Sequence, residues 1–190
     1  RLNKYLGLLY DSISDLKIAI ELDSDNSLKS KHYLFGSIAD RYLQLNQKEK
    51  ALENYLKEIE VSKDYSTPYL DLAEFYKSDG DNENAETNYN KAIRLDSLNQ
   101  ELYLKRSVFY YNNLNNLDRA IKDISKAIEL DNEDPYYYYV KGAYYSGNKQ
   151  YELAIIDYLK SLQMDNNNYI SDTYPLLNDL AVAYTNIDDT

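Results

Sequence analysis

Hydrophobic residues recur along this chain three and four residues apart, which is the spacing of amphipathic helices and not the alternation of strands. One apolar face is formed by Tyr69, Leu72, Ala73 and Tyr76. After the turn-forming residues 79–81, a second face of the same period is formed by Ala85, Tyr89, Ala92, Ile93 and Leu95. The pattern predicts two helices joined by a tight turn.

Helix-starting residues stand where these patterns begin. Thr67 precedes Pro68, and Asp134 precedes Pro135. Each pair predicts an N-cap followed by a proline in the first helical turn.

The helix pair is repeated along the chain. Small residues stand 39, 34, 35 and 34 residues apart, at Ser12, Ala51, Ala85, Ala120 and Ala154. Tyrosines stand 34, 34, 35 and 39 residues apart, at Tyr42, Tyr76, Tyr110, Tyr145 and Tyr184. Two independent series of residues, one small and one tyrosine, share one period, which predicts a tandem array of repeats. We divide it into four complete repeats, numbered 1 to 4: residues 32–65, 66–99, 100–134 and 135–168. Partial repeats at 1–26 and 174–190 flank them, and residues 1–190 are predicted to form a single domain.

The array resembles the tetratricopeptide repeat (TPR) family, whose unit is a 34-residue helix–turn–helix. Position 11 of every repeat is Tyr, position 20 is Ala, and position 8 is small, being Ala39, Ala73, Ser107 and Gly142. Small residues are needed where crossing helices approach closely. The resemblance implies an all-α fold in which the repeats stack into a right-handed superhelical solenoid. Arg106 and Lys141 depart from it, because position 7 is usually Leu.

Composition narrows the choice of partner. The chain has 21 Lys and Arg against 32 Asp and Glu, a net charge of −11. This charge disfavours nucleic acid, whose binding depends on basic residues that neutralise phosphates, and favours a cationic partner. Without an apolar run of about 18 residues, membrane insertion is not expected. The 23 tyrosines fit either a binding surface or an AT-rich coding sequence, and the compartment stays undetermined. Because no leader precedes Arg1, we expect a piece of a longer TPR protein.

Residues for catalysis or metal binding do not form a recognisable set. His32 is the only histidine and Cys is absent, so a His-based metal cluster is excluded; we expect His32 to be an exposed structural residue. Residues 79–90 resemble a calcium loop but carry Asn84 and Asn90 where Gly and Glu are required. We therefore predict a non-enzymatic protein with no catalytic residue, no metal site and no cofactor.

In the TPR family, positions 2, 5, 6, 9, 12 and 13 of the first helices line a concave groove. The resemblance places eleven candidate peptide-binding residues there: Asp40, Leu70, Asp71, Glu74, Glu101, Leu104, Lys105, Val108, Tyr111, Tyr136 and Tyr139. The earlier members are mainly acidic and the later ones mainly apolar or aromatic. This predicts a protein or peptide partner with a basic residue beside an apolar anchor. Alternatively, the rings complete packing between repeats and the acids provide solubility.

The same positions exclude one known TPR ligand class. Co-chaperones of the family that bind acidic chaperone tails carry Lys at position 5 and Asn at position 9. Here position 5 is Gly36, Leu70, Leu104 and Tyr139, and position 9 is Asp40, Glu74, Val108 and Ala143. We predict a protein–protein interaction scaffold. The alternatives are a regulatory or substrate-selecting arm of an enzyme outside these residues, and a homo-oligomeric self-association element.

Overall fold

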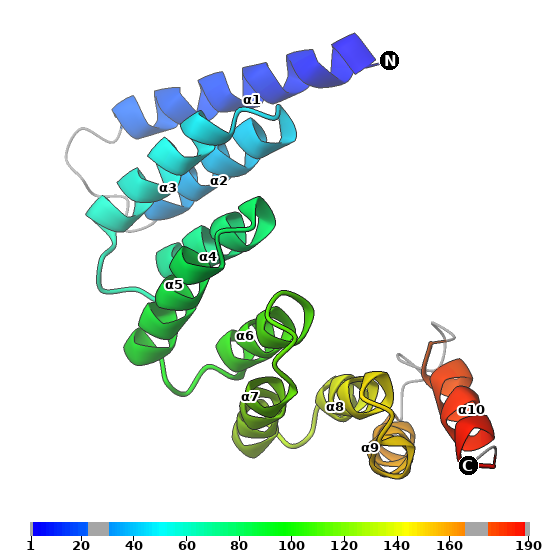
Figure 1. Ribbon diagram of the computed structural model, residues 1–190. Coiled ribbons are helices and arrows are strands. Elements are labelled where there is room, and N and C mark those ends of the chain that lie inside the picture. The colour runs from blue at the N-terminus through cyan, green and yellow to red at the C-terminus, as the bar shows by residue number, and fades with distance from the viewer. Residues whose placement is uncertain (1, 23–30, 166–174, 189–190) are drawn as a thin grey trace. The chain divides into compact units, whose positions relative to one another are not determined.

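The computed structural model describes residues 2–22, 31–165 and 175–188, which form ten α-helices and no strand (Figure 1). The helices are α1 (Leu2–Leu22), α2 (Lys31–Gln44), α3 (Lys48–Val61), α4 (Thr67–Asp79), α5 (Asn82–Leu95), α6 (Gln100–Asn112), α7 (Leu117–Leu130), α8 (Pro135–Gly147), α9 (Tyr151–Met164) and α10 (Pro175–Asp188). The predicted all-α class is confirmed. Within the described parts, each helix is too short or too polar to cross a membrane.

The chain divides into two compact units, residues 1–96 and 97–190. In the first unit, α2 packs against α3 and α4 against α5, while α1 covers α2 and α3 contacts α4. In the second unit, α6 packs against α7 and α8 against α9, and α7–α8 and α9–α10 contacts join the pairs. Four successive helix pairs thus follow one another along the chain. The predicted ends of the first partial repeat at residue 26 and of repeat 4 at residue 168 lie outside the described residues.

The small positions lie where paired helices cross. All four position-20 alanines, and Ala39, Ala73 and Ser107 at position 8, have no exposed surface. At the remaining position 8, a Cβ added to Gly142 would lie 2.6 Å from the Tyr158 ring. The small residues recur with this period because larger side chains at these crossings would force the helices apart.

The helix ends follow the predicted signals with one correction. The Asp134 carboxylate accepts a hydrogen bond from the Tyr136 amide at 2.8 Å, and Asp81 accepts one from the Asn84 amide at 3.1 Å. Between α4 and α5, Gly80 has φ +82°, a left-handed conformation that glycine adopts without strain. The prediction that Thr67 caps α4 is wrong: Thr67 is the first helical residue and Ser66 holds the cap position.

The basic residues at position 7 are explained by partners at position 23. Arg106 donates two hydrogen bonds to Asp123, at 2.6 and 2.8 Å, and Lys141 lies 3.2 Å from Asp157. Both aspartates are buried. Repeats 1 and 2 carry an apolar residue with an asparagine at these positions, namely Ile38 with Asn54 and Leu72 with Asn88. Position 7 thus changes together with position 23.

The expectation that His32 is exposed is wrong. Its side chain is buried, and the ring stacks on Tyr65 with centroids 5.5 Å apart and planes 18° apart. The histidine is therefore part of the packing at the start of α2.

Candidate functional site

In the first unit, the predicted groove positions lie on α2 and α4. Asp40, on α2, is exposed, and Leu70, Asp71 and Glu74, on α4, are half-buried. The two helices contact each other, and both contact α3.

Two of these acids are held by tyrosines from the second helix of their own repeat. The Tyr55 hydroxyl donates to Asp40 at 2.7 Å, and the Tyr89 hydroxyl donates to Glu74 at 2.5 Å. Burial, together with the hydrogen bond to the acid, raises the pKa of both tyrosines. An acid at position 9 therefore satisfies a buried hydroxyl at position 24 in repeats 1 and 2. This local role accounts for the pattern without a ligand.

The acids also differ in their cationic partners. Glu74 forms an ion pair with Lys77 on its own helix, and Glu101 forms one with Lys105 at 3.3 Å. In the described part of the chain, Asp40 and Asp71 have no such partner. The structure therefore leaves only some of the predicted acidic residues without a counter-charge.

The structure adds a residue that sequence reasoning did not include, Glu58 on α3. Its side chain has no exposed surface, and neither carboxyl oxygen has a hydrogen-bond partner among the described residues. Burial, with the charges of Asp71 and Asp40, raises the pKa of Glu58 to about 8. Burial, with Asp40 and Glu74, likewise raises the pKa of Asp71 to about 6.

A signal for Glu58 was present in the sequence. It occupies position 27, where the other complete repeats carry Ala92, Ala127 and Ser161. A long acid replacing a small residue at a helix crossing needs space from a neighbour, and Gly36 provides it: a Cβ added there would lie 2.9 Å from the Glu58 Oε2 atom.

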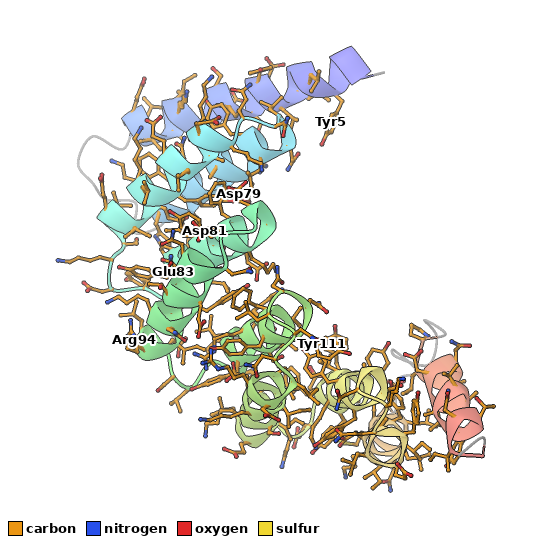
Figure 2. The ribbon with its side chains drawn as sticks, viewed as in Figure 1. Tyr5, Asp79, Asp81, Glu83, Arg94 and Tyr111 are labelled. Atoms are coloured by element: carbon orange, nitrogen blue, oxygen red, sulfur yellow. The ribbon has the colours of Figure 1, made fainter. Side chains whose placement is uncertain are left out.

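In the second unit, the predicted aromatic residues pack among other rings. Tyr111, near the end of α6 (Figure 2), stacks on Tyr144 with centroids 4.5 Å apart. The Tyr111 hydroxyl occupies space above Gly147, where an added Cβ would lie 1.7 Å from its oxygen. The Tyr144 hydroxyl lies 3.0 Å from Ser107 Oγ. Much of the Tyr111 ring therefore packs against other residues of the same chain.

Tyr136 is the most accessible aromatic candidate, at 42% exposed. Its ring lies 6.1 Å from Tyr139, whose hydroxyl donates to Asp179 on α10 at 3.1 Å. Lys105 and Val108 are half-buried, whereas Leu104 is only 8% exposed. Among the candidates of the second unit, Tyr136 therefore has the most accessible ring.

The described residues contain no group of three or more His, Cys, Asp or Glu side chains arranged to hold a metal ion.

Comparison with known proteins identifies the repeats. A model of the tetratricopeptide repeat matches residues 67–97, 101–134 and 135–168, just over half of the chain. The chain belongs to the tetratricopeptide repeat family. Repeats 2, 3 and 4 of the array correspond to the three matches, and the predicted recognition of TPR units is confirmed.

Solved structures show the same fold. BtubC from P. vanneervenii has 15% sequence identity and a TM-score of 0.81, over 100% of this chain and 85% of that one. The first TPR domain of Spaghetti (RPAP3), solved with the HSP90 peptide SRMEEVD, has 22% identity and a TM-score of 0.56, over 65% of this chain and 93% of that one. These likenesses establish a TPR solenoid fold.

One curated relative is an enzyme. The UDP-N-acetylglucosamine–peptide N-acetylglucosaminyltransferase of Giardia intestinalis is 36% identical over 89 residues, which is 47% of this chain. The match covers 6% of the length of that enzyme.

Proposed function

We propose that this chain is a protein-interaction scaffold that binds an extended segment of another protein along the first helices of its repeats. Membership of the TPR family carries this proposal, and it is supported by the Spaghetti domain, a similar fold that was solved bound to a peptide. The repeats stack helix pairs and leave the first helices of each pair to present side chains to a partner.

The partner segment is basic and apolar. Asp40 and Asp71 have no cationic partner among the described residues, and the net charge of the chain is −11, so Lys or Arg is attracted and a carboxylate is repelled. Tyr136 provides an accessible ring for an apolar side chain or for a cation–π contact. An acidic peptide such as SRMEEVD would meet Asp40 and Glu74 at position 9, so this chain is not expected to bind it.

Selection from a displayed peptide library, with the 190-residue chain as bait, tests the proposal. We expect enriched sequences in which Lys or Arg stands near an aromatic or aliphatic residue, and no binding of SRMEEVD. Asp40→Asn should slow association, because steering depends on charge, and Tyr136→Ala should speed dissociation, because it removes a contact. Glu152→Gln, an exposed change on the second helix α9, is the matched control. Enrichment of acidic peptides, or of none, would contradict the proposal.

A second candidate function is an accessory arm of an enzyme. The 36% identity with the Giardia transferase favours it, because that match lies within a much longer enzyme. Sequencing the coding region on both sides of these residues tests this candidate: a glycosyltransferase domain in the same reading frame is expected, and its absence would remove the alternative.

A further inference from the structure

One second helix carries an apolar stripe on its exposed face. On α9, Leu153, Ile156 and Leu159 are 43%, 62% and 43% exposed. They stand three residues apart, so they are neighbours along one side of the helix. The other side of α9 packs against α8 (Figure 1), and Ala154 and Tyr158 are buried there. The stripe therefore points away from the core of the second unit.

The other second helices are polar at the same places. The stripe occupies positions 19, 22 and 25 of repeat 4. These positions are Lys50, Glu53 and Leu56 in repeat 1, Asn84, Thr87 and Asn90 in repeat 2, and Arg119, Lys122 and Ser125 in repeat 3. Positions 19 and 22 are exposed in all three of these repeats, although α4 contacts α3 and α8 contacts α7. The next helix therefore leaves this face open, and among the complete repeats only repeat 4 is apolar at all three positions.

Opposite charges flank the stripe symmetrically. Glu152 stands four residues before Ile156 and Lys160 four residues after it, and both are exposed. No ion pair joins either of them to another described residue, although the Lys160 amine lies 6.0 Å from the centre of the Tyr138 ring. A leucine stands three residues to each side of Ile156. The face thus carries matching apolar residues, and opposite charges, at equal distances from its centre.

A second α9 that runs in the opposite direction complements this face. When the two Ile156 side chains meet at a two-fold axis, Leu153 lies level with Leu159 of the second copy. In the same register Glu152 lies level with Lys160 of the second copy, and the symmetry repeats both contacts. A parallel arrangement would instead place Glu152 beside Glu152 and Lys160 beside Lys160, which like-charge repulsion disfavours. A two-fold interface requires a self-complementary surface of this kind.

We propose that this chain forms a two-fold symmetric dimer through its α9 helices, which run antiparallel with Ile156 at the axis. The inference goes beyond the proposed peptide-binding function, because α9 is a second helix and the groove positions lie on first helices. A single pair of 14-residue helices is a small interface, and the net charge of −11 on each copy opposes association. The dimer is therefore weak and depends on concentration.

Sedimentation equilibrium measures the dimer directly. The 190-residue chain of 22.3 kDa is compared from about 10 µM to about 1 mM, since dimerisation follows mass action. The buffer contains about 0.15 M salt, which screens exposed charges beyond roughly 8 Å. We expect the mean mass to rise towards that of two copies and no further. A mass that stays at that of one copy would overturn the inference and leave the stripe to a different protein, and a mass beyond two copies would overturn the closed pairing.

Ile156→Glu tests whether the stripe forms the contact. It should abolish the rise in mass, because it places two carboxylates at the axis. Since the side chain is 62% exposed, the fold should be retained, which circular dichroism checks. Thr87→Glu, an exposed change at the same position of repeat 2, is the matched control and should dimerise like the unmodified chain. Equal dimerisation of Ile156→Glu and Thr87→Glu would place the contact elsewhere.

Charge exchange tests the register. Glu152→Lys should weaken the dimer at least about tenfold, because the new lysine faces Lys160 of the second copy. Adding Lys160→Glu should restore the affinity to within about threefold of that of the unmodified chain. Glu83→Lys makes the same charge change at an exposed residue (Figure 2) that holds the same position in repeat 2, and it should not weaken the dimer. A double variant as weak as Glu152→Lys alone would contradict the register.

Disulfide cross-linking tests the direction of the helices, because the chain contains no Cys. Ile156→Cys should form a disulfide between two copies on oxidation, since the two residues meet at the axis. In antiparallel helices the two residues of Glu152→Cys lie eight residues apart, about 12 Å, whereas a disulfide spans at most roughly 7 Å between Cα atoms. This variant should therefore not cross-link. Stronger cross-linking of Glu152→Cys than of Ile156→Cys would show parallel packing and overturn the proposal.

Discussion

Glu58→Gln should stabilise this chain increasingly as the pH rises. The folded state holds the Glu58 carboxyl buried beside Asp40 and Asp71, which raises its pKa from 4.5 to about 8. Between these two values the folded chain therefore binds more protons at Glu58 than the unfolded chain does. By linkage, this group contributes stability that is fully present below pH 4.5 and is lost as the pH rises through about 8. The glutamine variant lacks this loss.

The size of the effect follows from the two pKa values. Each unit of pKa difference corresponds to about 1.36 kcal/mol, so complete titration of Glu58 from its ordinary value to about 8 costs roughly 4–5 kcal/mol. Asp71 titrates in the same range, and protonation of one acid relieves the other. We therefore expect the stability difference between variant and parent to grow by about 2–4 kcal/mol from pH 5 to pH 8.5.

Urea unfolding followed by circular dichroism at pH 5, 6, 7, 8 and 8.5 measures this difference. Any constant cost of the unbonded glutamine amide cancels, because only the change with pH is compared. Glu60→Gln, exposed on the same helix, should differ from the parent by the same small amount throughout. A Glu58→Gln difference that stays constant within about 0.5 kcal/mol would show that the buried carboxyl does not titrate as inferred.

Two further changes test the repeat geometry. Ala120→Leu should destabilise the chain by roughly 1–3 kcal/mol, because the larger side chain overpacks a helix crossing. Lys122→Leu, an exposed change on the same helix, should be nearly neutral. Equal urea-unfolding midpoints for the two variants would show that the repeat positions are assigned wrongly. Asp123→Asn should lower the free energy of unfolding by about 3–5 kcal/mol, because it removes the carboxylate that pairs with the Arg106 charge. Adding Arg106→Leu, which reproduces the apolar–asparagine pair of repeat 2, should recover most of this loss. Additive effects in the double variant would refute a coupled pair.

The sequence determined the helical repeat, its period and the small residues at the helix crossings. These follow from local rules: apolar spacing selects the helix, proline and aspartate start it, and a fully buried Ala at each position 20 marks where backbones approach. The cap at Asp134 was predictable for the same reason, because a cap bonds to an amide two or three residues further along the chain.

Only the tertiary structure decided which charges pair between helices. Glu74 and Glu101 pair with lysines one turn away on their own helices, which helical spacing already allows, whereas Arg106 reaches Asp123 on the other helix of its pair. Burial of His32 depends on a ring from the end of repeat 1, Tyr65, which the exposed start of a helix does not predict. Glu58 shows the limit most clearly: its sequence position indicates only an unusual residue at a crossing. The space above Gly36 and the nearby acids of two other helices decide that the carboxyl is buried without a counter-charge, because burial and electrostatic coupling depend on distances between segments far apart in the chain.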